Sequence, residues 1–154
     1  MGVPEMHLRQ QFRVPAPIDA AWTTLLDIKG LVGCVPGATL TQVIGDSKWK
    51  GTLDFSLGAI HLLFDGTVEL KQADVGSRTI LMWVDGQETR GKGVAQGTVT
   101  SHLWEEEDDT VASVTAFLQM SGQIAQFSRG LIDDIANDYV TQFADNLAAQ
   151  MGRR

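Results

Sequence analysis

The sequence predicts a single α+β domain, residues 1–154, in which a curved antiparallel sheet of about seven strands wraps round one long C-terminal helix. Three observations predict this fold class. The elements follow in the order strand, two short helices, six strands and one long helix. Strand patterns joined by tight turns are typical of an antiparallel meander. One face of the strands is apolar, and the long helix is the element available to cover it.

The first strand and the two short helices are indicated by a change of period. Residues 6–14 alternate between apolar and polar side chains, as a strand with one solvated face does. Residues 16–33 instead carry a helical apolar stripe, made of Ile18, Trp22, Leu25 and Leu26. Pro17 suits the start of this helical segment and Gly33 suits its C-terminal cap. We expect Gly30 to break the segment into two short helices.

The next residues, 35–38, read Val-Pro-Gly-Ala and predict a sharp turn. Pro36 fits the second position of a type II turn, and Gly37 fits the third, which needs a positive φ. Cys34, the single cysteine, directly precedes the turn. We expect it to be a small buried hydrophobic residue rather than a reactive thiol, because no histidine lies near it in the sequence.

Alternation in the six later strands defines an inward and an outward face. The inward face contains many small residues, namely Gly51, Gly66, Gly86, Gly93, Ala95, Gly97, Ala112 and Ala116. Two explanations stay open: close packing of the helix on a curved sheet, or room for a ligand. Asp85-Gly86 is also a hairpin signal, which would break the fifth strand and change its register. Residues 123–151 are predicted to form one long amphipathic helix.

If a cavity separates this helix from the sheet, its lining and its ligand-binding residues are expected to be apolar. The expected residues are Trp22, Phe55, Leu62, Phe64, Met82, Val84, Leu118, Met120, Phe127, Leu131 and Ile135. Trp22 and the turn after Cys34 are expected to close one side. The predicted ligand is an apolar small molecule.

The same alternation directs Leu81, Trp83, Trp104 and Phe117 away from the helix. They fall on three consecutive strands, so they are expected to form one exposed cluster, and such a cluster usually marks an interface. Its partner would be a second copy of the chain, an enzyme subunit or a membrane surface. The alternative is a register slip near Gly86 that turns some of these side chains inward.

Composition excludes several function classes. The formal net charge is −7 and the basic residues are scattered, so nucleic acid is not an expected partner and direct membrane binding is expected to be weak or absent. Three dispersed histidines give no metal-ligand spacing, and no cofactor is expected to be bound covalently. The N-terminus has no apolar signal-peptide core, so the cytoplasm is the expected location.

The order and spacing of several short motifs resemble the family of the carbon monoxide dehydrogenase G subunit from about Glu5 to Leu147. The first block carries Phe12, Ala16-Pro17, Trp22, Leu26-Asp27 and the run Cys34-Val35-Pro36-Gly37-Ala38. The second carries Gly51, Leu57-Gly58, Phe64 and Gly66. Family members often continue beyond the long helix with a Pro/Ala-rich tail and a membrane-associating segment. This sequence stops at AAQMGRR. We expect either a truncated chain or a shorter relative that does not attach to a membrane.

The resemblance implies the helix-grip fold of birch-pollen-allergen-like and lipid-transfer-like domains. It also implies a cavity for a quinone or lipid, and an accessory role beside a carbon monoxide dehydrogenase or a related molybdenum hydroxylase. The resemblance implies as well that the protein helps to recruit that enzyme to the inner membrane face.

Two other function classes compete with this interpretation. A polyketide cyclase-like enzyme would need a positioned acid or base, and the inward ionisable residues are Arg78, Glu88 and Glu105, all near strand ends. A desolvated Glu88 would have a raised pKa, whereas a solvated one or one paired with Arg90 would be structural. With no paired carboxylates and no triad in the sequence, we assign no catalytic residue and favour binding. A solidly packed interaction domain without a cavity is the third alternative.

Overall fold

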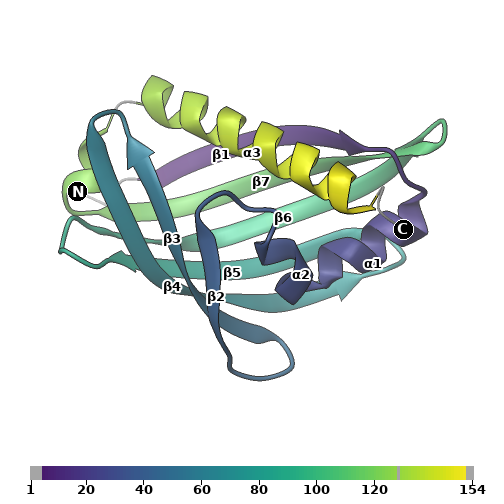
Figure 1. Cartoon of the computed structure of the whole chain (residues 1–154), viewed down its shortest axis with the longest axis horizontal. Helices are drawn as coiled ribbons and strands as arrows, with labels where there is room; N and C mark the ends of the chain where they lie inside the picture. The colour runs from purple at the N-terminus through teal and green to yellow at the C-terminus, as the bar shows by residue number, and fades with distance from the viewer. Residues whose placement is uncertain (1–4, 128, 152–154) are drawn as a thin grey trace.

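The computed structural model describes residues 5–127 and 129–151. Its elements are β1 (Glu5–Val14), α1 (Ile18–Leu26), α2 (Ile28–Val32), β2 (Ala38–Val43), β3 (Lys48–Leu57), β4 (Ile60–Asp74), β5 (Thr79–Glu88), β6 (Val94–Glu106), β7 (Asp109–Ser121), the 3₁₀ helix η1 (Gln123–Gln126) and α3 (Arg129–Met151). The strands form a 7-stranded sheet in the order β1-β7-β6-β5-β4-β3-β2. All neighbouring strands are antiparallel, and α3 lies across one face of the sheet (Figure 1). The predicted meander, the two short helices and the long helix are confirmed.

The helical segments of residues 16–33 and 123–151 are interrupted at positions that the sequence did not indicate. The break between α1 and α2 falls at Asp27, whose carboxylate accepts a hydrogen bond from the Gly30 amide and caps α2, so Gly30 lies inside the second helix. The predicted helix of residues 123–151 is interrupted at Phe127, which has an extended conformation between η1 and α3. β5 is continuous, because Gly86 pairs with Gly66 on one side and with Ala95 on the other.

The apolar interior is divided into two clusters. One fills the end of the sheet covered by α1, α2 and the C-terminal half of α3, and its buried members are Phe12, Val14, Ala21, Trp22, Leu25, Cys34, Ile80, Leu103, Ala112 and Leu147. The other contains Met6, Leu62, Met120 and Ile124 near the start of β1 and η1. Leu147 and Leu62 are both 0% exposed. Since burying such a side chain contributes about 1.5–3 kcal/mol, each cluster anchors its own end of α3 or η1 to the sheet.

The turn between α2 and β2 has the predicted geometry. Gly37 has a φ of 78°, and the Ala38 amide donates to the Val35 carbonyl over 3.2 Å, as in a type II turn. The Asp54 amide then donates to the Gly37 carbonyl, which fastens the turn to β3. These two hydrogen bonds, one within the turn and one to β3, therefore fix the direction in which the chain leaves α2 and enters the edge strand β2.

Cys34 is placed by this turn against α3. It is 2% exposed, its thiol donates to the Gln150 side chain over 3.0 Å, and its carbonyl accepts from Asn146. Burial raises the pKa of the Cys34 thiol, which lowers the fraction of reactive thiolate.

We expect a thiol reagent to label Cys34 in the native protein far more slowly than in the urea-unfolded protein, because labelling requires the α2–α3 contact to open. The measurement is the labelling rate at fixed pH in both states. Equal rates would show that the thiol is accessible in the folded chain.

Candidate ligand-binding cavity

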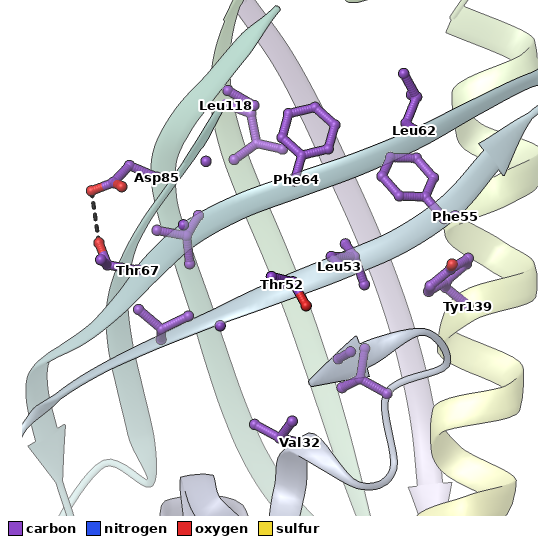
Figure 2. Close-up of a pocket in the computed structure, with 18 of the residues that line it drawn as sticks. Val32, Thr52, Leu53, Phe55, Leu62, Phe64, Thr67, Asp85, Leu118 and Tyr139 are labelled. Atoms are coloured by element: carbon purple, nitrogen blue, oxygen red, sulfur yellow. Dashed lines mark hydrogen bonds between the residues drawn. The ribbon is translucent and has the colours of Figure 1, made fainter. Parts of the chain in front are cut away.

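A cavity of about 540 Å³ lies between the sheet and the N-terminal half of α3. Inward side chains of β3 and β4 form one wall, Ile132, Ile135, Ala136 and Tyr139 of α3 form another, and the segment from α2 to β2 borders it (Figure 2). Pockets of about 300–1,000 Å³ are typical of small-molecule sites. The size is therefore that of a ligand site rather than of a packing defect.

The floor of the cavity is a row of small residues that crosses the sheet. Strand register aligns Gly51 with Gly66, Gly66 with Gly86, and Gly86 with Ala95. All of them line the cavity. These positions carry little or no side chain, so no large side chain projects from them into the cavity. At Gly51 and Gly66 an added Cβ would also meet the backbone of the neighbouring strand, 2.5 Å from the Thr39 oxygen and 2.0 Å from the Asp85 oxygen. The row therefore serves the close approach of strands in a curved sheet and also leaves room above it, whereas Ala112 packs in the first cluster.

Larger side chains border this row. The rings of Phe55 and Phe64 stack with centroids 5.8 Å apart and planes 19° from parallel. Tyr139 of α3 meets Phe55 edge to face at 6.1 Å, so these rings form an aromatic corner between β3 and α3 (Figure 2). Leu118 of β7 lies beside Phe64 on the other side. A planar apolar molecule could contact ring faces and aliphatic side chains here at once.

The structure brings most, but not all, of the predicted lining residues to the cavity. Those that line it are Phe55, Leu62, Phe64, Val84, Leu118, Met120 and Ile135. Trp22 and Met82 do not, because they pack in the first apolar cluster, at the end of the sheet that α1 covers. Phe127 packs against the second cluster. Leu131 is half-buried on α3 but outside the lining, because the helix presents its neighbour Ile132.

Several lining residues were missed by the sequence analysis. The segment from α2 to β2 contributes Ile28, Val32, Val35, Ala38 and Leu40. On β3 and β4, alternation already placed Trp49, Leu53 and Val68 on the inward face, so the signal was present. For α2 there was no local signal, because a short helix does not indicate which part of the sheet it will border. Val35 and Ala38 put part of the predicted turn at the cavity, as expected, but Trp22 does not join them.

The ionisable side chains considered for catalysis lie outside the cavity lining. Glu88 is 1% exposed, and its carboxylate accepts hydrogen bonds from the backbone amides of Leu63 (3.0 Å), Arg90 (2.8 Å) and Lys92 (3.3 Å). The Leu63 amide above all, with the other two amides and the Arg90 guanidinium 3.6 Å away, lowers the pKa of Glu88 to about 2 in spite of its burial. The expectations of a raised pKa and of a solvated carboxylate are therefore wrong, whereas the alternative of a structural Glu88 paired with Arg90 is confirmed. Its role is to hold the β5–β6 connection against β4.

The other two candidates also have structural partners. Arg78 forms an ion pair with Asp19 and lies over the Trp22 ring at 5.6 Å. Glu105 accepts a hydrogen bond from the Ile18 amide at the start of α1. Among residues 5–127 and 129–151, no group of three or more His, Cys, Asp and Glu side chains could hold a metal ion. The helices described in these two ranges are too short or too polar to cross a membrane.

The outward aromatic residues fall into two groups rather than one cluster. Strand register aligns Trp83, Thr98, Phe117 and His7 in one row, in which the Phe117 and His7 rings are 4.6 Å apart. Trp104 lies farther along β6, about 20 Å from Thr98 at the usual strand rise. The prediction of a single contiguous cluster is therefore wrong, because three adjacent strands can carry outward residues at distant positions. Leu81 lies beside Trp83, and Phe117 is 43% exposed.

Comparisons with solved structures agree with this architecture. A conserved protein from Geobacillus kaustophilus is 17% identical, with 96% of each chain covered and a TM-score of 0.84. The Zhui aromatase/cyclase from a Streptomyces species is 16% identical, with 97% of this chain and 95% of that chain covered and a TM-score of 0.65. A START superfamily protein from Mycobacterium smegmatis is 12% identical, with 96% and 97% covered and a TM-score of 0.59. These likenesses confirm the helix-grip fold.

The sequence comparisons identify the family. No curated protein matches the chain. The family model for CoxG, the G subunit of carbon monoxide dehydrogenase, in contrast matches residues 11–152, which includes every helix and nearly every strand. The motifs named in the sequence, from Phe12 to Gly66, all lie inside that match. The chain belongs to the CoxG family of carbon monoxide dehydrogenase G subunits.

Proposed function

We propose that this protein binds an apolar small molecule, such as a quinone or a lipid, in the cavity between α3 and the sheet. The observation that carries the proposal is the cavity itself, about 540 Å³ in volume and lined almost entirely by apolar groups. A ligand and the wall it covers would bury roughly 600 Å² of apolar surface, worth about 15 kcal/mol. After about 7 kcal/mol of association cost, micromolar affinity remains.

In this proposal the protein is an accessory subunit of a carbon monoxide dehydrogenase or a related molybdenum hydroxylase, and family membership supports it. A part in recruiting that enzyme to the inner membrane face belongs to the same proposal and rests on the family alone. Binding is favoured over cyclase-like catalysis because Glu88, the buried carboxylate, is held ionised by backbone amides outside the cavity lining.

Filling the cavity tests the binding proposal. Leu118 projects into the cavity, whereas Phe117, the preceding residue on β7, projects to the outer face. We expect Leu118→Trp to weaken the binding of an apolar fluorescent dye by about 10-fold or more, since an indole there occupies ligand space. Phe117→Trp is the matched control and should leave the dye affinity unchanged.

Both variants must retain the wild-type circular dichroism spectrum and cooperative unfolding. If the dye binds Leu118→Trp as tightly as it binds the wild type, the binding site lies elsewhere. If both variants lose the dye to the same extent, the loss reflects damage to β7 rather than filling of the cavity.

We propose further that the outer face beside Trp83 and Phe117 binds a protein partner, either the enzyme or a second copy of this chain. Phe117 is exposed and Trp83 is half-buried. The outward positions nearest to them on β6 and β7 carry no formal charge at neutral pH: Gln96, Thr98, Thr100, Ser113, Thr115 and Gln119. Charged residues lie at the margins of this area, among them Glu69 of β4 opposite Trp83 and Arg9 of β1 opposite Thr115. Aromatic groups in an uncharged centre with charged residues around it are typical of a protein interface.

The double variant Trp83→Ser/Phe117→Ser should therefore weaken binding to a carbon monoxide dehydrogenase holoenzyme, or self-association, by about 10-fold or more. Sedimentation velocity with and without the enzyme measures both. Trp104→Ser, on the distant part of β6, is the control. The proposal fails if the double variant folds normally and neither association changes.

A further inference from the structure

One row of outward residues crosses the middle of the sheet. Strand register aligns one residue from each of β1, β7, β6, β5 and β4, and in that order they are His7, Phe117, Thr98, Trp83 and Glu69, here called the outer row. All of them are exposed or half-buried. β6 is the middle strand of these neighbours. The outer row therefore has an aromatic residue on each side of Thr98, a histidine at one end and a carboxylate at the other.

A two-fold axis directed along β6 maps the outer row onto itself. If the outer faces of two copies packed against each other about this axis, β7 of one copy would lie over β5 of the other, and β1 over β4. Phe117 would then face Trp83 of the second copy, and Thr98 would lie on the axis. His7 would face Glu69 of the second copy. The row is thus self-complementary, with aromatic groups against aromatic groups and a base against an acid.

The rows on either side fit the same axis. Strand register carried across the five strands gives their facing pairs as Arg9–Gln72, Glu5–Thr67 and Asp85–Gln119. No two like charges face each other in these pairs, and the long Arg9 side chain can also reach Glu69 of the second copy. An axis directed across the strands would instead place Glu69 over Glu69 of the second copy. The charges therefore favour the axis along β6.

The size of the contact indicates a weak dimer. Five strands about 4.8 Å apart and three rows about 7 Å apart cover roughly 24 Å by 20 Å, or about 500 Å² of each copy. This area is an upper value, because the sheet wraps round α3 and its outer face is convex (Figure 1). The two copies would together bury at most about 1,000 Å², the lower limit for a specific interface. We therefore expect a dissociation constant on the order of micromolar or weaker.

We propose that the outer row binds a second copy of the chain, in a back-to-back dimer whose two-fold axis runs along β6. This inference rests on the proposed function, in which the face beside Trp83 and Phe117 binds a protein, and it assigns the partner and its orientation. The formal net charge of −7 is not concentrated at the contact, since the acidic run 105–109 and the aspartates of α3 lie outside the three rows. Because α3 covers the opposite face of the sheet, both cavities stay accessible in the dimer (Figure 1).

Charge reversal tests this orientation. Within one chain, Arg9 and Glu69 lie on β1 and β4, about 19 Å apart across the sheet, so they cannot pair with each other. In the dimer, Arg9 of one copy lies beside Glu69 of the other. The variants are Arg9→Glu, Glu69→Arg and their combination, and Asp65→Arg, on β4 but outside the three rows, is the control. Sedimentation velocity of the full chain from about 1 to 300 µM measures self-association.

We expect each single reversal to weaken self-association by about 10-fold or more, because it places like charges opposite each other. The combined variant should return to within about 3-fold of the wild type, since the reversed charges pair again between copies. Asp65→Arg should change self-association by less than about 2-fold. All variants must keep the wild-type circular dichroism spectrum and cooperative unfolding.

Three results would overturn the inference. A dimer in which the combined variant stays as weak as the single variants does not have its axis along β6. A wild type that is monomeric at every concentration has no such dimer. If Trp83→Ser/Phe117→Ser then still weakens binding to the dehydrogenase holoenzyme, the proposed protein-binding face stands with the enzyme as its partner. If that variant binds the enzyme as the wild type does, the proposed protein-binding function fails as well.

Discussion

Replacing Gly37 by alanine is expected to lower the free energy of unfolding by about 2–5 kcal/mol. Two costs add at this position. Gly37 has a φ of 78°, which L-residues adopt only with strain, and an added Cβ would lie 2.0 Å from the Asp54 carbonyl oxygen. Backbone atoms of β3 would have to move, because the contact is not with a flexible side chain. Chemical denaturation followed by circular dichroism measures the change.

Two other glycines separate the two costs. Gly58 also has a positive φ, 60°, but an added Cβ would meet nothing within 4 Å. Gly45 has open space and no such φ. We therefore expect Gly58→Ala to cost about 1–2 kcal/mol and Gly45→Ala to stay within about 0.5 kcal/mol of the wild type. If Gly37→Ala costs no more than Gly58→Ala, the turn does not approach β3 as closely as described.

Glu88→Gln is expected to change how stability depends on pH. The pKa of Glu88 is lowered from 4.5 to about 2 on folding, mainly by the Leu63 amide and then by the amides of Arg90 and Lys92. A lowered folded-state pKa stabilises the fold above the unfolded value, and this stabilisation is lost as the pH falls from about 4.5 towards 2. Unfolding of the wild type should therefore take up one more proton in this window than unfolding of Glu88→Gln.

The variant should also be less stable at neutral pH, because an amide cannot accept all of the hydrogen bonds that the carboxylate accepts. Urea unfolding at intervals between pH 2 and 7 measures both effects. Glu107→Gln, at the exposed β6–β7 turn, is the control and should leave the profile nearly unchanged. Identical pH profiles for the wild type and Glu88→Gln would contradict the buried, ionised carboxylate.

The fold followed from the sequence because its signals are local and agree with one another. Strand alternation placed Phe55, Phe64, Val84 and Leu118 on one face, and antiparallel register keeps that assignment along whole strands. The positive φ of Gly37 was likewise predictable, since a Pro-Gly pair largely determines the turn type.

The remainder of the site depends on contacts between segments far apart in the sequence. α2 borders the cavity because the turn at Gly37 directs β2 along β3. The apolar stripe of residues 18–26 does not indicate this long-range arrangement. For the same reason Trp22 was predicted to line the cavity, whereas it packs in the first cluster. On α3 the predicted Ile135 does line the cavity, but one turn earlier Ile132 rather than the predicted Leu131 reaches it. The glycine row could have been found by aligning the predicted strands.

Native mass spectrometry of the purified full chain tests the central claim, ligand binding in the cavity, most directly. After incubation with an apolar lipid and quinone extract, the wild type and Phe117→Trp should both carry a non-covalent adduct of one defined mass that gentle activation releases. Leu118→Trp, whose new side chain occupies the cavity, should carry little or none. An adduct of equal occupancy on all three proteins, or on none of them, would contradict a ligand-binding role for this cavity.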